Sequence, residues 1–187
     1  MEAQQDSRLE AALGKAIRGD QAGFAEIVEE HQGMVFSIAY HFLRNNAVAE
    51  ELAQEVFLHL YQNLSSIQSA AHLKYWLRRV TTHRCIDQSR RQKFRPEVAL
   101  EEVAEPAVAS SSPDWMLSER LQKTVASLPE KQRMIVILRY QEELGPAEIA
   151  ELLKMPVNTV KSTLNRSLAE LRKRLTRSFG GMKYAIF

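Results

Sequence analysis

A group of short polar and basic side chains near residue 160 has the chemistry needed to contact the edges of DNA bases. Their spacing places them on one face of a helix that we predict from about residue 158 to residue 179. They are Thr159, Lys161, Ser162, Asn165 and Arg166. Arginine can pair with guanine and asparagine with adenine, whereas lysine, serine and threonine mostly hold phosphates. The pattern favours a DNA-recognition helix over the alternative, a solvated basic face within a helical bundle.

Four further cations follow on the same predicted helix, nearer its C-terminal end. They are Arg172, Lys173, Arg174 and Arg177. Because a recognition helix enters the major groove by its N-terminal end, we expect these cations to meet the phosphate backbone rather than bases.

A second basic block lies between residues 78 and 95, which hold seven Lys or Arg and one Asp. It adjoins Tyr75 and Trp76, and cations beside aromatic rings suit a groove that holds phosphates and stacks bases. Trp76 also shares a helical stripe with Leu73 and Val80, which favours a place in the core. The arginines therefore carry the prediction of nucleic-acid binding, and the role of Trp76 stays open.

Charge alternates along the chain although the net charge is only +2. Residues 96–119 hold six acidic residues and no Lys or Arg, and they separate the block 78–95 from a basic segment that follows residue 119. Two basic surfaces divided by an acidic spacer suggest two contacts with a polyanion. The alternative is a pair of solvated helix faces.

The first half of the chain is predicted to be helical. Apolar residues recur at spacings of three, four and seven over 22–43, at a strict spacing of four over 47–64, and again at helical spacing over 72–93. Each pattern predicts an amphipathic helix, and residues 65–71 are predicted to form a loop. With a further short helix over 7–18, residues 1–95 would form one small domain.

Residues 96–113 differ in kind, with three prolines, a serine run and acidic charge only, which predicts a flexible linker. The second domain, 114–187, begins with another helix. Two short helices, a tight turn at 154–158 and the long basic helix follow, an order typical of a helix-turn-helix. No strand pattern occurs, so we predict an all-α fold of two small helical domains joined by a flexible acidic linker.

The sequence lacks the usual arrangements for catalysis. It shows no nucleophile–base pair, Gly-rich phosphate loop or metal-ligand cluster; the five histidines are scattered, and the single cysteine, Cys85, excludes an internal disulfide. We therefore expect no enzyme activity, no cofactor and no metal. No apolar run approaches the roughly 20 residues of a membrane-spanning helix, and the N-terminus lacks a signal-peptide core. The expectation is a soluble, cytoplasmic protein that does not insert into a membrane.

Several short motifs occur in a defined order. They are AEELAQEVFL at 49–58, WLRRV at 76–80, DQSRR at 87–91, LPEKQR at 128–133, EIAE at 148–151 and TVKS at 159–162. With these motifs the chain resembles the extracytoplasmic-function (ECF) sigma factors of bacterial RNA polymerase, over about residues 20–95 and 114–176. The resemblance implies a protein that binds polymerase core and directs promoter recognition, DNA opening and transcription initiation.

The resemblance also implies that helix 47–64 docks on the clamp helices of the largest polymerase subunit. The residues that would form this face are Glu50, Leu52, Gln54, Glu55, Phe57 and Leu58. Phe57 and Leu58 fall outside the every-fourth stripe, so both are candidates for an exposed apolar contact. For Phe57, the alternative that it widens the core face stays open.

Two promoter contacts are implied as well. Helix 72–93 and the loop 65–71 would engage the −10 element, where the strands part and a base flips into a protein pocket. The candidate contacts there are Arg78, Arg79, His83, Arg84, Asp87, Arg90 and Arg91. The helix-turn-helix would read the −35 element as duplex through the polar face that contains Arg166.

The chain departs from the family pattern at two positions. Where relatives often have asparagine it has His83, so that base preference there is in doubt and the imidazole is either a pH-sensitive contact or a spacer. Where relatives usually have glycine in the turn it has Asn158, which can supply a left-handed backbone or a helix N-cap.

The partners implied by the resemblance are polymerase core, promoter DNA and an anti-sigma factor. The chief alternative is a stand-alone helix-turn-helix regulator, which leaves the acidic and apolar helix of the first half unexplained. A purely structural helical adaptor leaves both basic blocks unexplained. Binding to polymerase core discriminates the sigma-factor prediction from both alternatives.

Overall fold

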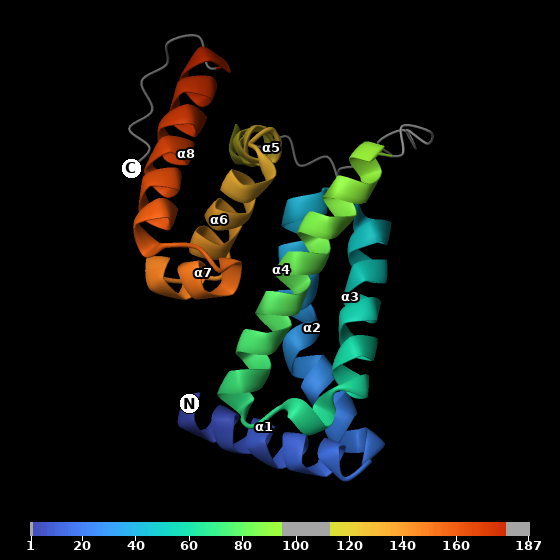
Figure 1. Cartoon of the computed structure of the whole chain (residues 1–187). Helices are drawn as coiled ribbons and strands as arrows, with labels where there is room; N and C mark the ends of the chain where they lie inside the picture. The colour runs from blue at the N-terminus through green and yellow to red at the C-terminus, as the bar shows by residue number, and fades with distance from the viewer. Residues whose placement is uncertain (1, 95–112, 179–187) are drawn as a thin grey trace. The chain divides into compact units, whose positions relative to one another are not determined.

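The computed structural model describes residues 2–94 and 113–178 (Figure 1). Within these ranges the chain forms eight α-helices and one 3-10 turn, and no strand. The all-α prediction is confirmed for this part of the chain. Contacts divide the chain into two compact units, Met1–Arg91 and Gln92–Phe187. The predicted linker lies outside the described residues except for Pro113, and the tail 179–187 lies outside them entirely.

Unit 1 contains four helices and a short turn. These are α1 (Glu2–Ile17), α2 (Gln21–Leu43), α3 (Asn46–Gln62), the 3-10 turn η1 (Leu64–Ser66) and α4 (Ala70–Phe94). The helices α2, α3 and α4 lie roughly side by side, and α1 lies across one end of them (Figure 1). The three long helices begin and end within two residues of the predicted bounds, whereas α1 begins five residues earlier than expected.

Side-chain caps explain where two of these helices begin. The Asp20 carboxylate accepts a backbone N–H at 2.8 Å at the start of α2, and the Asn45 side chain does so at 3.0 Å at the start of α3. Both bonds satisfy N–H groups that a helix leaves unpaired at its first turn. Gly23 allows α1 and α2 to approach, because a Cβ there would lie 2.6 Å from the Lys15 Cβ.

The core of unit 1 is built by apolar side chains from all of its long helices. They include Ile27, Val35, Ile38, Phe42, Leu52, Val56, Leu60, Leu73 and Leu77. On α4 the predicted inner face is only partly right, because Trp76 and Val80 are half-buried. The buried stripe continues with Thr81 and Cys85, and the Thr81 hydroxyl donates to the Leu77 carbonyl at 2.7 Å. That bond satisfies the hydroxyl, so threonine can occupy a core position.

Unit 2 contains α5 (Pro113–Ala126), α6 (Glu130–Tyr140), α7 (Pro146–Leu153) and α8 (Val157–Ser178). The long helix α8 packs against each of the other three. The pair α7 and α8 with its short turn is the predicted helix-turn-helix. No helix in the described part of either unit is long and apolar enough to cross a membrane.

The turn between α7 and α8 differs from the expectation at Asn158. The left-handed residue is Lys154, with φ 50° and ψ 54°, and its N–H bonds back to the end of α7. Asn158 is the second residue of α8, so it supplies neither a left-handed backbone nor the N-cap. The Pro156 carbonyl instead accepts the N–H groups of Thr159 and Val160, at 2.9 and 3.1 Å, and so closes the first turn of α8.

Candidate nucleic-acid interface

The helix α8 has two well-separated faces. Its inner face is buried and consists of Val160, Leu164, Ser167 and Leu171, at spacings of four, three and four. All five residues predicted to contact duplex DNA, namely Thr159, Lys161, Ser162, Asn165 and Arg166, are exposed on the other side. The structure therefore presents these side chains together on one accessible surface of the helix.

Local hydrogen bonds order two side chains of this surface. The Ser162 hydroxyl donates to the Thr159 carbonyl at 3.1 Å, and Arg166 Nε–H donates to the Ser162 carbonyl at 3.2 Å. The second bond uses only one donor of the guanidinium, whose planar fork of N–H groups suits a paired contact with guanine.

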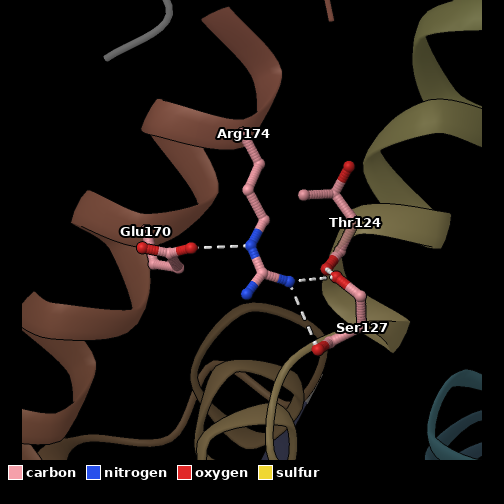
Figure 2. Close-up of polar contacts among 4 residues, drawn as sticks. All are labelled: Thr124, Ser127, Glu170 and Arg174. Atoms are coloured by element: carbon pink, nitrogen blue, oxygen red, sulfur yellow. Dashed lines mark hydrogen bonds and ion pairs between the residues drawn. The ribbon is translucent and has the colours of Figure 1, made fainter. Parts of the chain in front are cut away.

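Arg174 departs from the expectation that it meets DNA phosphates. Its Nη1 donates to the Ser127 hydroxyl at 2.5 Å and to the Ser127 carbonyl at 3.3 Å, while Nε donates to Glu170 at 2.7 Å (Figure 2). The guanidinium is thus held within unit 2. The other three cations near this end of the helix, Arg172, Lys173 and Arg177, are exposed.

The candidate residues on α4 are less uniform than those on α8. His83, Asp87, Arg90 and Arg91 are exposed, whereas Arg78, Arg79 and Arg84 are half-buried. Arg90 lies 3.9 Å from Asp87, and His83 Nδ1 lies 2.7 Å from the Arg79 carbonyl, to which a ring N–H at that position donates. The cations of this helix are therefore spread over its exposed face and its flanks.

Arg84 contacts a residue predicted for a different site. Its Nη1 lies 2.5 Å from Glu55 Oε2 on α3, although Glu55 was assigned to the polymerase-binding face and Arg84 to the DNA-binding face. Sequence spacing gave no signal for this pair, because the two residues are 29 positions apart.

The predicted polymerase-binding face of α3 requires correction at two positions. Leu52 is only 5% exposed and Phe57 only 8% exposed, so both are core residues and the alternative reading of Phe57 is right. Glu50, Gln54 and Glu55 are exposed, and Leu58 is 60% exposed. Four exposed residues form a continuous stripe at spacings of three, four and three: Glu51, Gln54, Leu58 and Tyr61. The predicted face did not include Glu51 and Tyr61, although their spacing relative to Leu58 places them on the same side of the helix.

Buried titratable groups occur in unit 1 but face the core. His31 is 5% exposed, and burial lowers its pKa, with Lys74 and Arg78 acting in the same direction and Glu30 opposing them. Burial also raises the pKa of the Cys85 thiol. Trp76 packs against His59 of α3 with ring centroids 5.3 Å apart, which supports a packing role. In the described ranges no group of three His, Cys, Asp or Glu side chains has the arrangement of a metal site.

Both units of the chain are similar to known protein families. The family model for Sigma-70 region 2 matches residues 27–95, and that for Sigma-70 region 4 matches residues 118–171. The chain is 34% identical over 184 residues to the ECF RNA polymerase sigma factor SigW of Bacillus subtilis (strain 168), covering 89% of this chain and 96% of that protein. The chain belongs to the ECF sigma factors of RNA polymerase.

Solved structures agree with this fold. CnrH, solved with the cytosolic domain of CnrY, superposes with a TM-score of 0.69 at 18% identity, covering 91% of this sigma factor and 98% of CnrH. The sigma factor RpoE of Bartonella quintana, solved with the anti-sigma factor NepR, gives a TM-score of 0.68 at 20% identity, covering 82% and 96% of the two chains. At such low identity the likeness concerns the fold.

The matched regions contain most of the candidate residues of this sigma factor. Region 2 covers α3, α4 and most of α2. Region 4 covers α6, α7, most of α5 and the greater part of α8. The last turns of α8, including Arg174, lie beyond the region 4 match. The contacts of Arg174 are therefore a feature that the family match does not cover.

Proposed function

We propose that the two units of this sigma factor divide promoter recognition, with α4 binding the opened −10 element and α8 reading the −35 element as duplex. The observation that carries the proposal is the exposure of all five predicted duplex contacts on one face of α8, directly after the turn at Lys154. A recognition helix requires such a face, because base edges are read by short polar and basic side chains in the major groove.

The −10 contact is assigned to the exposed C-terminal half of α4. His83, Asp87, Arg90 and Arg91 are accessible there, and Arg78, Arg79 and Arg84 lie at its flanks. Cations on this surface would hold the phosphates of the separated strand, which has lost its pairing partner. Asp87 would discourage phosphates at its own position, so it suits a contact with a base amino group.

The polymerase contact is assigned to the exposed stripe of α3. Leu58 is a large apolar side chain surrounded by Glu51, Gln54 and Glu55, the pattern of an anchor inside a polar rim. Leu52 and Phe57 would support this surface from the core rather than touch polymerase. Domain bounds of 1–95 and 114–187 with a linker over 96–113 are part of this proposal, and the linker would raise the effective concentration of one domain once the other is bound.

The proposal also includes a regulatory partner and a location in the cell. An anti-sigma factor is proposed as a regulator, since the sigma factor RpoE of Bartonella quintana was solved with the anti-sigma factor NepR. The protein would act in the cytoplasm, where polymerase and promoter DNA occur. It would perform no reaction of its own, because polymerase carries out RNA synthesis.

Run-off transcription with bacterial core polymerase on a pool of promoter fragments tests the proposal. Promoter-specific transcripts are expected only when the protein is added, and Arg166→Ala should remove most of them. Lys123→Ala is the matched control, because it also removes one exposed positive charge from unit 2 but lies on α5. If core neither binds the protein nor yields new transcripts while the protein alone binds duplex sites, the stand-alone regulator replaces this proposal.

A second measurement separates the two DNA contacts. Binding of a single-stranded −10 oligonucleotide by the sigma–core complex should weaken with Arg91→Ala and remain unchanged with Arg166→Ala. Binding of a duplex −35 fragment should show the opposite pattern. If either variant lost the same affinity for both probes, the assignment of the −10 element to α4 and of the −35 element to α8 would be wrong.

A further inference from the structure

Arg174 occupies the inward-facing side of α8, unlike the cations around it. The buried stripe Val160, Leu164, Ser167 and Leu171 advances by four, three and four residues, and a further step of three reaches Arg174. Positions separated by these steps lie on one side of a helix. Its side chain is only 38% exposed, and Arg172, Lys173 and Arg177 project from other sides of the helix.

The guanidinium reaches the C-terminal end of another helix. Ser127 directly follows α5, and its hydroxyl and carbonyl both accept from Arg174 Nη1, at 2.5 and 3.3 Å (Figure 2). The same hydroxyl donates to the Thr124 carbonyl at 2.7 Å. Carbonyls at a helix C-terminus lack partners within the helix and carry partial negative charge, so a cation there is favourable. Arg174 thereby caps α5 from across the unit.

Glu170 orients the guanidinium for this contact. Its carboxylate accepts from Arg174 Nε at 2.7 Å one turn earlier on α8, and this hydrogen bond lowers the pKa of Glu170. With Nε held by Glu170, the planar guanidinium directs Nη1 toward Ser127 (Figure 2). A lysine ammonium lacks this fork and cannot reproduce both contacts in the same geometry.

We propose that Arg174 is a positioning residue for promoter recognition: it ties α8 to the turn between α5 and α6 and thereby sets the orientation of the DNA-reading half of the helix. Because α8 is one continuous helix, a constraint at Arg174 is transmitted to Arg166, about 12 Å away along the axis. Beyond Leu171 no described residue of α8 is fully buried, and the hydrogen bonds from Arg174 to Ser127 hold this end of the helix to the end of α5. The inference rests on the proposed reading of −35 duplex by α8.

The test is the salt dependence of promoter binding by the full chain with core polymerase. Arg174→Ala should weaken binding roughly fivefold, within the range for coupled neighbouring groups, while the slope of log K against log salt stays that of the parent chain. A residue that neutralises one phosphate would instead change the slope by about 0.9 on its removal. A slope change of that size, or parent-like affinity, would overturn the proposal.

Arg174→Lys distinguishes positioning from charge. We expect it to bind as weakly as Arg174→Ala, because the required contacts depend on the guanidinium fork, whereas a phosphate contact would survive as lysine. Restoration of parent affinity by lysine would therefore overturn the proposal. All measurements are made at a temperature where circular dichroism shows each variant fully folded, since a residue that only stabilises unit 2 would leave affinity unchanged there.

Ser127→Ala provides a test that keeps Arg174 in place. It removes the hydroxyl acceptor but retains the carbonyl, so a smaller loss of roughly twofold is expected, and no additional loss when it is combined with Arg174→Ala. If the affinity losses of the two variants multiply in the combined variant, Arg174 does not act through its contact with Ser127. If the parent chain itself shows no promoter-specific binding with core, the proposed function has failed; if only the variants fail to differ from the parent, the positioning role has failed.

Discussion

The two basic helices α4 and α8 reach their exposed surfaces in different ways. In α8 the buried stripe is mainly apolar, and every predicted duplex contact lies on the opposite, exposed side. In α4 the apolar stripe ends at Leu77 and is continued by Thr81 and Cys85, while three of its predicted DNA contacts are half-buried. Periodicity therefore identifies exposed polar residues well where a mainly apolar stripe defines the other face of the helix, as in α8, and less well in α4.

The largest expected effect concerns the apolar part of the α4 stripe. Leu77→Ala should lower the free energy of unfolding by about 2–5 kcal/mol, because Leu77 is fully buried and its truncation leaves a cavity. Urea unfolding followed by circular dichroism measures the loss. Leu58→Ala, at an exposed leucine of α3, is the control and should stay within about 0.5 kcal/mol of the parent. Similar losses from both variants would show that burial does not separate these positions.

The next effect sharpens the assignment of α8. Arg166→Ala should weaken promoter binding by about 1–3 kcal/mol and relax the preference at one base pair, as loss of a bidentate guanine contact does. Competition binding against promoters substituted at each −35 position measures both quantities. A loss of affinity that is equal for all sequences would mean that Arg166 holds a phosphate and does not read a base.

We expect histidines to make the stability of unit 1, but not that of unit 2, depend on pH, because all five histidines precede residue 92. Burial holds the pKa of His31 below its ordinary value of 6.5, so the unfolded chain binds this proton more readily than the folded chain. The free energy of unfolding should therefore fall as pH is lowered from about 7 toward 5, by at most about 1.4 kcal/mol per pH unit for one proton. Urea unfolding across this range measures it.

His31→Gln should flatten this pH dependence. His41 contributes in the same direction, because burial and Arg44 lower its pKa too, so the double variant with His41→Gln should flatten it further. An unchanged pH dependence in the double variant would remove both histidines as its cause.

The smallest effect concerns the ion pair between Glu55 and Arg84. The Glu55 side chain is 54% exposed and the Arg84 side chain 35%, so water screens the pair. The coupling free energy in a double-mutant cycle should be only about 0.2–1 kcal/mol and decrease in high salt. The variants Glu55→Gln, Arg84→Gln and their combination, compared by urea unfolding, measure it. A coupling well above this range would make the pair a structural link between α3 and α4 rather than a surface contact.

Much of the fold was predictable because helix formation depends on local spacing. The long helices of unit 1 appeared within two residues of their predicted bounds, and the turn at Lys154 lies where the sequence indicated. The predictions were wrong at positions whose local sequence is compatible with two structural roles. Phe57 lies beside the core stripe and proved buried, and Asn158 suited a cap but lies inside α8.

The helices and the polar face of α8 could be predicted from the amino-acid sequence, because each depends on residue types at short, regular spacing. The resemblance to the ECF sigma factors could be recognised as well, because it depends on short motifs in a defined order. Which cations form contacts within the protein could not be predicted in this way, because these contacts join residues far apart in the sequence. Arg174 meets Ser127 across 47 residues, and Arg84 meets Glu55 across 29. Such pairs depend on how helices pack and on the rotamers that packing permits, and neither is encoded in the local periodicity of one helix.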